Sequence, residues 1–155
     1  MKTEIERKFL VADTGFLADL EGERLRQGYI ASTGRATVRV RICGTRAWLT
    51  LKGCTEGISR PEFEYPVPLA HAEICIAHLC TGPVVEKTRY RVAHNSHTWY
   101  VDVFHGDNEG LVLAEIELTR EDECFACPPW LGVEVSGDPR YYNSNLAKRP
   151  YRSWA

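Results

Sequence analysis

The chain has 155 residues, of which 44% are hydrophobic and 26% charged, a composition that excludes a disordered or fibrous protein. This length favours one domain spanning residues 1–155. The formal net charge of −2 excludes a global positive field for nucleic acid or an anionic membrane, so any anion site must be local. No apolar run approaches the roughly 20 residues of a membrane span, and no signal-peptide pattern opens the chain, so we expect a cytoplasmic protein.

Strand-like runs separated by turn signals such as Gly44-Thr45 and Asn95-Ser96 fill most of the chain. Eight runs are predicted as strands: Thr3–Val11, Arg24–Ala31, Ala36–Cys43, Arg46–Gly53, Pro61–Val67, Val84–Ala93, Thr98–Phe104 and Leu111–Leu118. Many short antiparallel strands joined by tight turns indicate a barrel or a sandwich.

Short helical pieces are predicted between and after these strands. Three are expected after Asp13 or Thr14, from about Pro68 to about Leu79, and around Asn143–Lys148. A further helix is expected to begin at Thr119, because Thr119-x-x-Asp122 has the spacing of a capping box.

Charged residues alternate with mostly apolar neighbours on six of the stretches. They are Glu4, Glu6 and Lys8; Arg39 and Arg41; Lys52; Glu62 and Glu64; Lys87 and Arg89; and Glu115 and Glu117. Because a strand sends residues i and i+2 to the same side, each set points one way together. The alternation alone leaves two interpretations open, a sandwich with a solvated charged face and a barrel with charges lining a hydrated channel.

The kinds of charge favour the channel. Arginine supplies a planar fork that matches phosphate oxygens, and lysine supplies a compact charge. Glu4 and Glu6 lie on the first strand and Glu115 and Glu117 on the last, and these strands become neighbours when a sheet closes. Gathered carboxylates repel one another unless a hard cation such as Mg²⁺ or Mn²⁺ lies among them. A basic cradle beside an acidic metal site suits polyphosphate chemistry, which depends mainly on positioning and charge stabilisation.

The Glu4-x-Glu6-x-Lys8 motif resembles the CYTH family, also called triphosphate tunnel metalloenzymes. The resemblance spans the whole chain and includes LRQGY at 25–29, VRVR at 38–41, LTLK at 49–52, SRPEFE at 59–64, VEKTRY at 85–90, DVF at 102–104, AEIEL at 114–118 and the ending NSNLAKRPY. It implies a mainly β fold with short peripheral helices, built on an eight-stranded antiparallel barrel whose charged lumen binds triphosphate with a divalent metal.

The resemblance also implies roles for individual residues. The implied phosphate binders are Lys8, Arg39, Arg41, Lys52, Lys87 and Arg89. The implied ligands of Mg²⁺ or Mn²⁺ are Glu4, Glu6, Glu115 and Glu117, with Glu62, Glu64 and Asp102 as further lumen carboxylates. Tyr29 matches a family tyrosine near the end of the second strand. Its expected role is either proton transfer assisted by Lys87 or packing at the barrel rim.

The function expected from these residues is metal-dependent hydrolysis of inorganic tripolyphosphate to pyrophosphate and phosphate. Glu6 or Tyr29 is expected to take the proton of the attacking water. The partner is then a small-molecule triphosphate, without nucleic acid or membrane, and a homodimer is compatible with this reading. The alternatives are a nucleoside or thiamine triphosphatase, a class IV adenylate cyclase, and a polyphosphate-binding module without catalysis.

The six cysteines are expected to be buried, reduced thiols. Cys124-x-x-Cys127 resembles half of a zinc site, but the other half would need Cys75 and Cys80, whose spacing is loose for that purpose. We therefore favour free cysteines over a zinc site.

Overall fold

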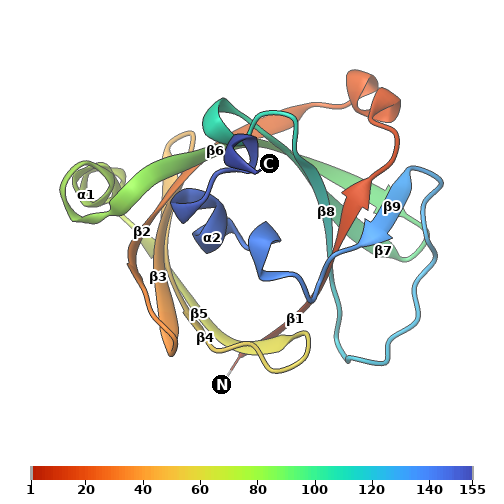
Figure 1. The fold of residues 1–155 in the computed structure, drawn as a ribbon, viewed down its shortest axis with the longest axis horizontal. Coiled ribbons are helices and arrows are strands. Elements are labelled where there is room, and N and C mark those ends of the chain that lie inside the picture. The colour runs from red at the N-terminus through yellow and green to blue at the C-terminus, as the bar shows by residue number, and fades with distance from the viewer. Residues whose placement is uncertain (1, 155) are drawn as a thin grey trace.

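The structure, a computed structural model, describes residues 2–154 (Figure 1). The strands are β1 (Thr3–Val11), β2 (Gly22–Ser32), β3 (Ala36–Cys43), β4 (Arg46–Gly53), β5 (Ser59–Val67), β6 (Thr81–His94), β7 (His97–Phe104), β8 (Val112–Glu117) and β9 (Leu131–Glu134). The helices and helical turns are η1 (Gly15–Asp19), α1 (Leu69–Ile74), η2 (Cys75–Leu79), η3 (Gly106–Asn108), η4 (Pro139–Tyr141), α2 (Asn143–Lys148) and η5 (Tyr151–Ser153).

Strands β1 to β8 form a closed antiparallel barrel in the order β1-β5-β4-β3-β2-β6-β7-β8, which Figure 1 shows as a ring. β1 closes the ring because it has partners on both edges. Residues 6–10 of β1 pair with residues 113–117 of β8, and residues 3–5 pair with residues 59–61 of β5. The short β9 continues the second edge of β1 beyond β5. The predicted eight-stranded antiparallel barrel with short helices is therefore confirmed.

The predicted strand boundaries are close to the observed ones, and β1, β3 and β4 begin and end as predicted. The helix predicted at Thr119 is wrong. The Glu123 carboxylate, rather than Asp122, accepts hydrogen bonds from the Thr119 backbone N and Oγ1, at 2.6 and 2.7 Å, and holds a turn. The following segment stays irregular, and its residues Phe125 and Trp130 pack on the outer core.

The main apolar core lies outside the ring. Phe9, Trp99 and Ile116 on the outer faces of β1, β7 and β8 are covered by Leu17 of η1 and by Trp130. A second cluster joins the outer faces of β3 and β4 to α1. Alternation in β1, β3 and β8 therefore sends the apolar side chains of these clusters outward and Lys8, Arg39, Arg41 and Glu115 inward.

The C-terminal tail covers one end of the barrel. Figure 1 shows α2 lying across the ring opening. Leu146 and Ala147 of α2 pack against Tyr29, Val85 and Phe104, which belong to β2, β6 and β7. The barrel is thus closed by apolar packing at this end. Among residues 2–154, no helix combines the length and the apolar character needed to cross a bilayer.

The six cysteines are free thiols. The expectation that they are buried is correct for Cys43 and wrong for Cys54, Cys124 and Cys127, which are exposed. The last two lie in the irregular segment beside Phe125, which packs on the outer core in place of the cysteines. Within the described part of the chain, no three His, Cys, Asp or Glu side chains are grouped to hold a metal ion on their own.

Candidate active site

The charged side chains predicted to gather do line one cavity inside the barrel, of about 210 Å³. Every residue proposed above as a phosphate binder or metal ligand lines it, together with Tyr29, Glu62 and Glu64. Asp102 lies behind this lining and is fully buried. The alternation that left two interpretations open in the sequence therefore belongs to a barrel with its charges inside.

One ion cluster joins β1, β4 and β5. Lys52 Nζ lies 2.8 Å from Glu4 Oε1 and 3.3 Å from Glu62 Oε2. Arg60 Nε donates to Glu4 Oε2 at 2.8 Å. Burial raises the pKa of Glu4, but Lys52 and Arg60 outweigh it and hold this pKa well below its usual range. Glu4 is therefore a carboxylate already compensated by two cations.

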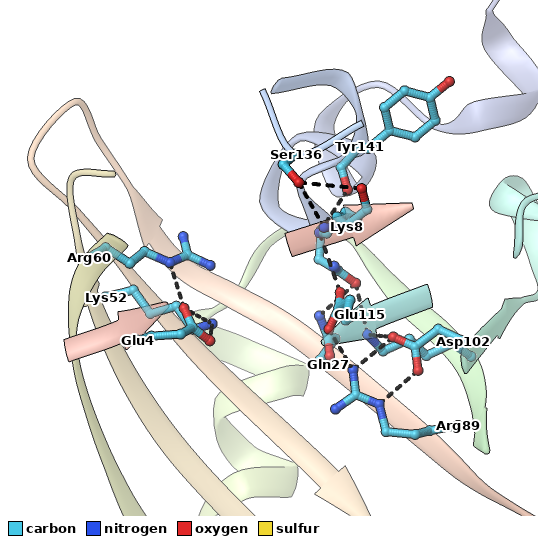
Figure 2. Close-up of polar contacts among 12 residues, drawn as sticks. Glu4, Lys8, Gln27, Lys52, Arg60, Arg89, Asp102, Glu115, Ser136 and Tyr141 are labelled. Carbon is cyan, nitrogen blue, oxygen red and sulfur yellow. Dashed lines mark hydrogen bonds and ion pairs between the residues drawn. The ribbon is translucent and has the colours of Figure 1, made fainter. Parts of the chain in front are cut away.

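A second ion cluster joins β6, β7, β8 and β1, and Figure 2 shows it apart from the first. Asp102 accepts from Arg89 at 2.7 and 2.8 Å and from Lys87 Nζ at 2.7 Å. Arg89 also reaches Glu115 at 3.2 Å, and Glu115 lies 3.4 Å from Lys8 Nζ. Burial lowers the pKa of Lys87 to about 7. The attraction of Asp102 opposes this shift, and the repulsion of Arg89 adds to it.

The two arginines of β3 lack close carboxylate partners. Arg39 donates to Thr50 Oγ1 at 3.2 Å and reaches Glu64 only at 3.4 Å, and its buried Nε has no hydrogen-bond partner among the described residues. Arg41 Nε donates to the amide oxygen of Gln27 at 3.1 Å. Burial and repulsion from Arg39 and Arg89 lower the pKa of Arg41 to about 9. Buried cations in this condition favour an anion as their missing partner.

Two carboxylates, Glu6 and Glu117, lack the close cationic partners that Glu4 has among the described residues. Glu6 and Glu117 lie side by side across the β1–β8 pairing. Burial raises the pKa of Glu6 to about 7, and Glu115 and Glu4 add to the shift. Burial also raises the pKa of Glu117, and Glu4 and Glu62 support this against Lys2. Crowded carboxylates with raised pKa values suit a divalent cation, whose remaining ligands would be phosphate oxygens and water.

Tyr29 lies where the polar cavity meets the apolar end of the barrel. Its ring belongs to the cluster under α2, which fits the packing role, and it also lines the cavity. Its hydroxyl oxygen accepts a hydrogen bond from Gln27 Nε2 at 3.1 Å, so its own proton points elsewhere. Both roles expected for Tyr29 are compatible with this position.

Several cavity residues were missed from the sequence. Arg60 stands at an inward position of β5, and only its placement two residues before Glu62 could have indicated it. Gln27 is fully buried behind the cavity lining, and as a neutral residue it gave no charge signal. Tyr142 and Asn143 come from the tail, far from the strands in sequence, although NSNLAKRPY was part of the family resemblance. The charge pattern therefore found the charged walls but not the tail side of the cavity.

Comparisons with known proteins agree with this geometry. The model of the CYTH domain matches residues 2–151. The chain is 47% identical over 154 residues to the inorganic triphosphatase of Acetivibrio thermocellus, covering 99% of both chains. It is 41% identical over 149 residues to the inorganic triphosphatase of Nitrosomonas europaea, covering 94% of this chain and 97% of that one. A solved crystal structure of an inorganic triphosphatase superposes with a TM-score of 0.64 at 38% identity, over 92% of this chain and 96% of the other. The chain belongs to the CYTH domain family.

Proposed function

We propose that this protein is an enzyme that hydrolyses inorganic tripolyphosphate to pyrophosphate and phosphate inside the barrel, with Mg²⁺ or Mn²⁺. The observation that carries the proposal is the pair Arg39 and Arg41, two cations of the barrel cavity that contact a hydroxyl and an amide, with the Glu64 carboxylate 3.4 Å from Arg39. The full-length similarity to two inorganic triphosphatases, at 47% and 41% identity, supports the same substrate.

In this proposal the cavity cations form two groups with different roles in binding the phosphates. Arg39 and Arg41 bind phosphate oxygens directly, because an anion would complete their hydrogen bonds. The remaining phosphate binders are Lys8, Lys52, Lys87 and Arg89. Lys52, Lys87 and Arg89 already pair with carboxylates at 2.7 to 2.8 Å, so they contribute less free charge and more fixed geometry. Lys8 lies 3.4 Å from Glu115, the same distance as Arg39 from Glu64. Together these cations stabilise the charge that develops on the leaving pyrophosphate.

Glu6 and Glu117 would hold the divalent ion, with Glu4 and Glu115 beside them. When bound, such an ion neutralises phosphate charge and lowers the pKa of a coordinated water. The proton of the attacking water would pass to Glu6 or to Tyr29. Glu6→Gln and Tyr29→Phe distinguish the two, because only loss of the true proton acceptor removes the fall in rate on the acidic side of the pH–rate profile.

The test measures phosphate release from tripolyphosphate, ATP and thiamine triphosphate side by side, with Mg²⁺, with Mn²⁺ and with chelator, and looks for cyclic AMP. We expect tripolyphosphate to have the highest kcat/KM and chelator to abolish turnover. A marked preference for ATP or thiamine triphosphate would replace the proposed substrate. Tight binding of tripolyphosphate without metal-stimulated turnover would identify a binding module instead.

A cytoplasmic location is the remaining part of this proposal, and a homodimer is compatible with it. Cell fractionation tests the first. Light scattering during size-exclusion chromatography tests the second, and a mass near 17.6 kDa would show a monomer.

A further inference from the structure

We propose that Gln27 is a positioning residue. Its neutral side chain holds Arg41 in place without neutralising it, so that Arg41 keeps its full charge for the substrate, and Asn143 from the tail fixes the orientation of Gln27. This inference rests on the proposed function for the identity of the anion. Neither residue is charged. Together they form a hydrogen-bonded link between two charged side chains, Arg41 and Lys87.

The contacts of Gln27 join three elements. Gln27 is fully buried on β2. Its Oε1 accepts from Arg41 Nε of β3 at 3.1 Å. Its Nε2 donates to the Tyr29 hydroxyl at 3.1 Å and to Asn143 Oδ1 of α2 at 3.3 Å. Asn143 Oδ1 also accepts from Lys87 Nζ of β6 at 3.0 Å.

The direction of these hydrogen bonds follows from the donors at the two ends of the series, Arg41 and Lys87. Arginine and lysine side chains only donate, so an oxygen must face each of them. Lys87 therefore requires the Asn143 oxygen, and Arg41 requires the Gln27 oxygen. The Gln27 amide nitrogen is then left to donate to Asn143 and Tyr29, as it does. One orientation of each amide satisfies all four contacts.

Neutrality distinguishes Gln27 from the two carboxylates that each hold a pair of cavity cations. Asp102 holds Lys87 and Arg89 with a carboxylate, and Glu4 does the same for Lys52 and Arg60. Each of these contacts fixes a cation and also cancels charge. An amide oxygen fixes a cation and cancels none, so Arg41 stays short of negative charge until an anion arrives. The lowered pKa of Arg41 is consistent with this environment.

Two substitutions at this position separate charge from shape. Gln27→Glu keeps an acceptor for Arg41 and nearly the same volume but adds a negative charge. Gln27→Met keeps the length of the side chain and removes the acceptor. We expect Gln27→Glu to weaken tripolyphosphate binding by about 10- to 100-fold, the range set by a hydrogen bond to a charged group. We expect Gln27→Met to change binding by less than about threefold and to lower kcat by about tenfold, because Arg41 loses its orientation but not its charge.

The measurement is calorimetric titration of each variant with tripolyphosphate in the absence of metal, followed by kcat and KM with Mg²⁺. Asn95→Asp is the matched control, since it makes the same change from amide to carboxylate in the exposed β6–β7 turn. It should leave the dissociation constant within about twofold, because an exposed charge is screened by salt. Thermal melts establish which variants are folded.

Equal losses of affinity in Gln27→Glu and Gln27→Met would overturn the inference, because a merely structural residue does not distinguish the two. Wild-type affinity in Gln27→Glu would overturn it as well. If Gln27→Glu does not fold, Gln27→Met still decides, since an unchanged kcat contradicts a positioning role. If the wild type binds tripolyphosphate without hydrolysing it, the proposed function fails while the binding comparison at Gln27 stands.

Discussion

β3 and β6 each send two cations into the cavity at positions i and i+2, but their charges are compensated to different degrees. Lys87 and Arg89 of β6 contact the Asp102 carboxylate at 2.7 to 2.8 Å. Arg39 and Arg41 of β3 contact a hydroxyl and an amide, and the one carboxylate near Arg39 lies at 3.4 Å.

The difference arises on the neighbouring strands. Asp102 of β7 stands directly opposite Arg89 in the register. Arg39 stands opposite Tyr29 and Thr50, and Arg41 opposite Gln27 and Trp48. The β6 cations therefore form a fixed, compensated part of the wall, whereas the β3 cations form the part that, in the proposed function, the substrate anion completes. Removing charge should therefore affect stability on the β6 side and activity on the β3 side.

Asp102→Asn should have the largest effect on the fold. It preserves shape but leaves Arg89 buried without its main carboxylate, and removing one partner of a buried pair costs about 3–5 kcal/mol. Lys87 can lose its proton, since its pKa is about 7, so Arg89 accounts for most of the loss. Urea unfolding at pH 7.5 measures it. Glu64→Gln is the control. It removes the β5 carboxylate that lies 3.4 Å from Arg39 of β3, and it should lower the free energy of unfolding by less than about 1 kcal/mol. An unchanged midpoint in Asp102→Asn would mean that β6 does not depend on this pair.

Arg39→Ala should have the largest effect on turnover. In the proposed function Arg39 binds the substrate, so kcat/KM for tripolyphosphate should fall by at least about 100-fold. The free energy of unfolding should stay constant or rise, because a buried guanidinium with an unpartnered Nε is lost. Steady-state kinetics and urea unfolding measure the two effects. Arg26→Ala, an outer cation paired with Glu73, is the control and should change neither value strongly. A destabilised but active Arg39→Ala would reverse the assignment of β3.

How far the sequence could predict this contrast depends on which property is considered. Period-two alternation identified the inward positions and gave the exact bounds of β1, β3 and β4. It could not say whether the charged face lies inside, because alternation is the same in a barrel and a sandwich. The family resemblance decided that point, since Glu4-x-Glu6-x-Lys8 occurs with its downstream pairs in order.

The partner of each inward cation and the contacts of the tail could not be predicted, because they depend on strand register and on residues far apart in the sequence. Whether an inward cation is compensated depends on the residue opposite it, as Asp102 is for Arg89, and no local pattern specifies that pairing. Gln27 and Asn143 are 116 positions apart and meet only in the folded barrel. At Thr119 a local capping pattern predicted a helix, but the packing of Phe125 and Trp130 on the outer core takes precedence.

The same comparison, between charges with and without close partners of opposite sign, can be made for the carboxylates by varying the pH. Glu4 is compensated by two cations, whereas Glu6 has a pKa raised by burial to about 7. A raised carboxyl pKa contributes stability that is present below the unfolded value of 4.5 and is lost as pH rises through about 7. In metal-free protein, wild type should therefore lose about 1–3 kcal/mol relative to Glu6→Gln between pH 4.5 and 8. Urea unfolding of both proteins in chelator measures the difference. A constant difference across this range would show that Glu6 is compensated like Glu4.

Arg7→Ala should have the smallest effect and tests whether inward direction, rather than charge, makes a β1 residue functional. Arg7 and Lys8 are adjacent cations on opposite faces of the strand. Arg7 pairs on the outer surface with Glu134 of β9 at 2.6 and 2.7 Å, while Lys8 lines the cavity. An exposed ion pair contributes about 0–1 kcal/mol, so Arg7→Ala should lower stability by no more than that and leave kcat/KM within about twofold. Lys8→Ala, measured in parallel, should lower kcat/KM by at least about 100-fold. Equal activity losses in the two variants would mean that the charge of β1 acts at long range, and the distinction between its two faces would then carry no functional meaning.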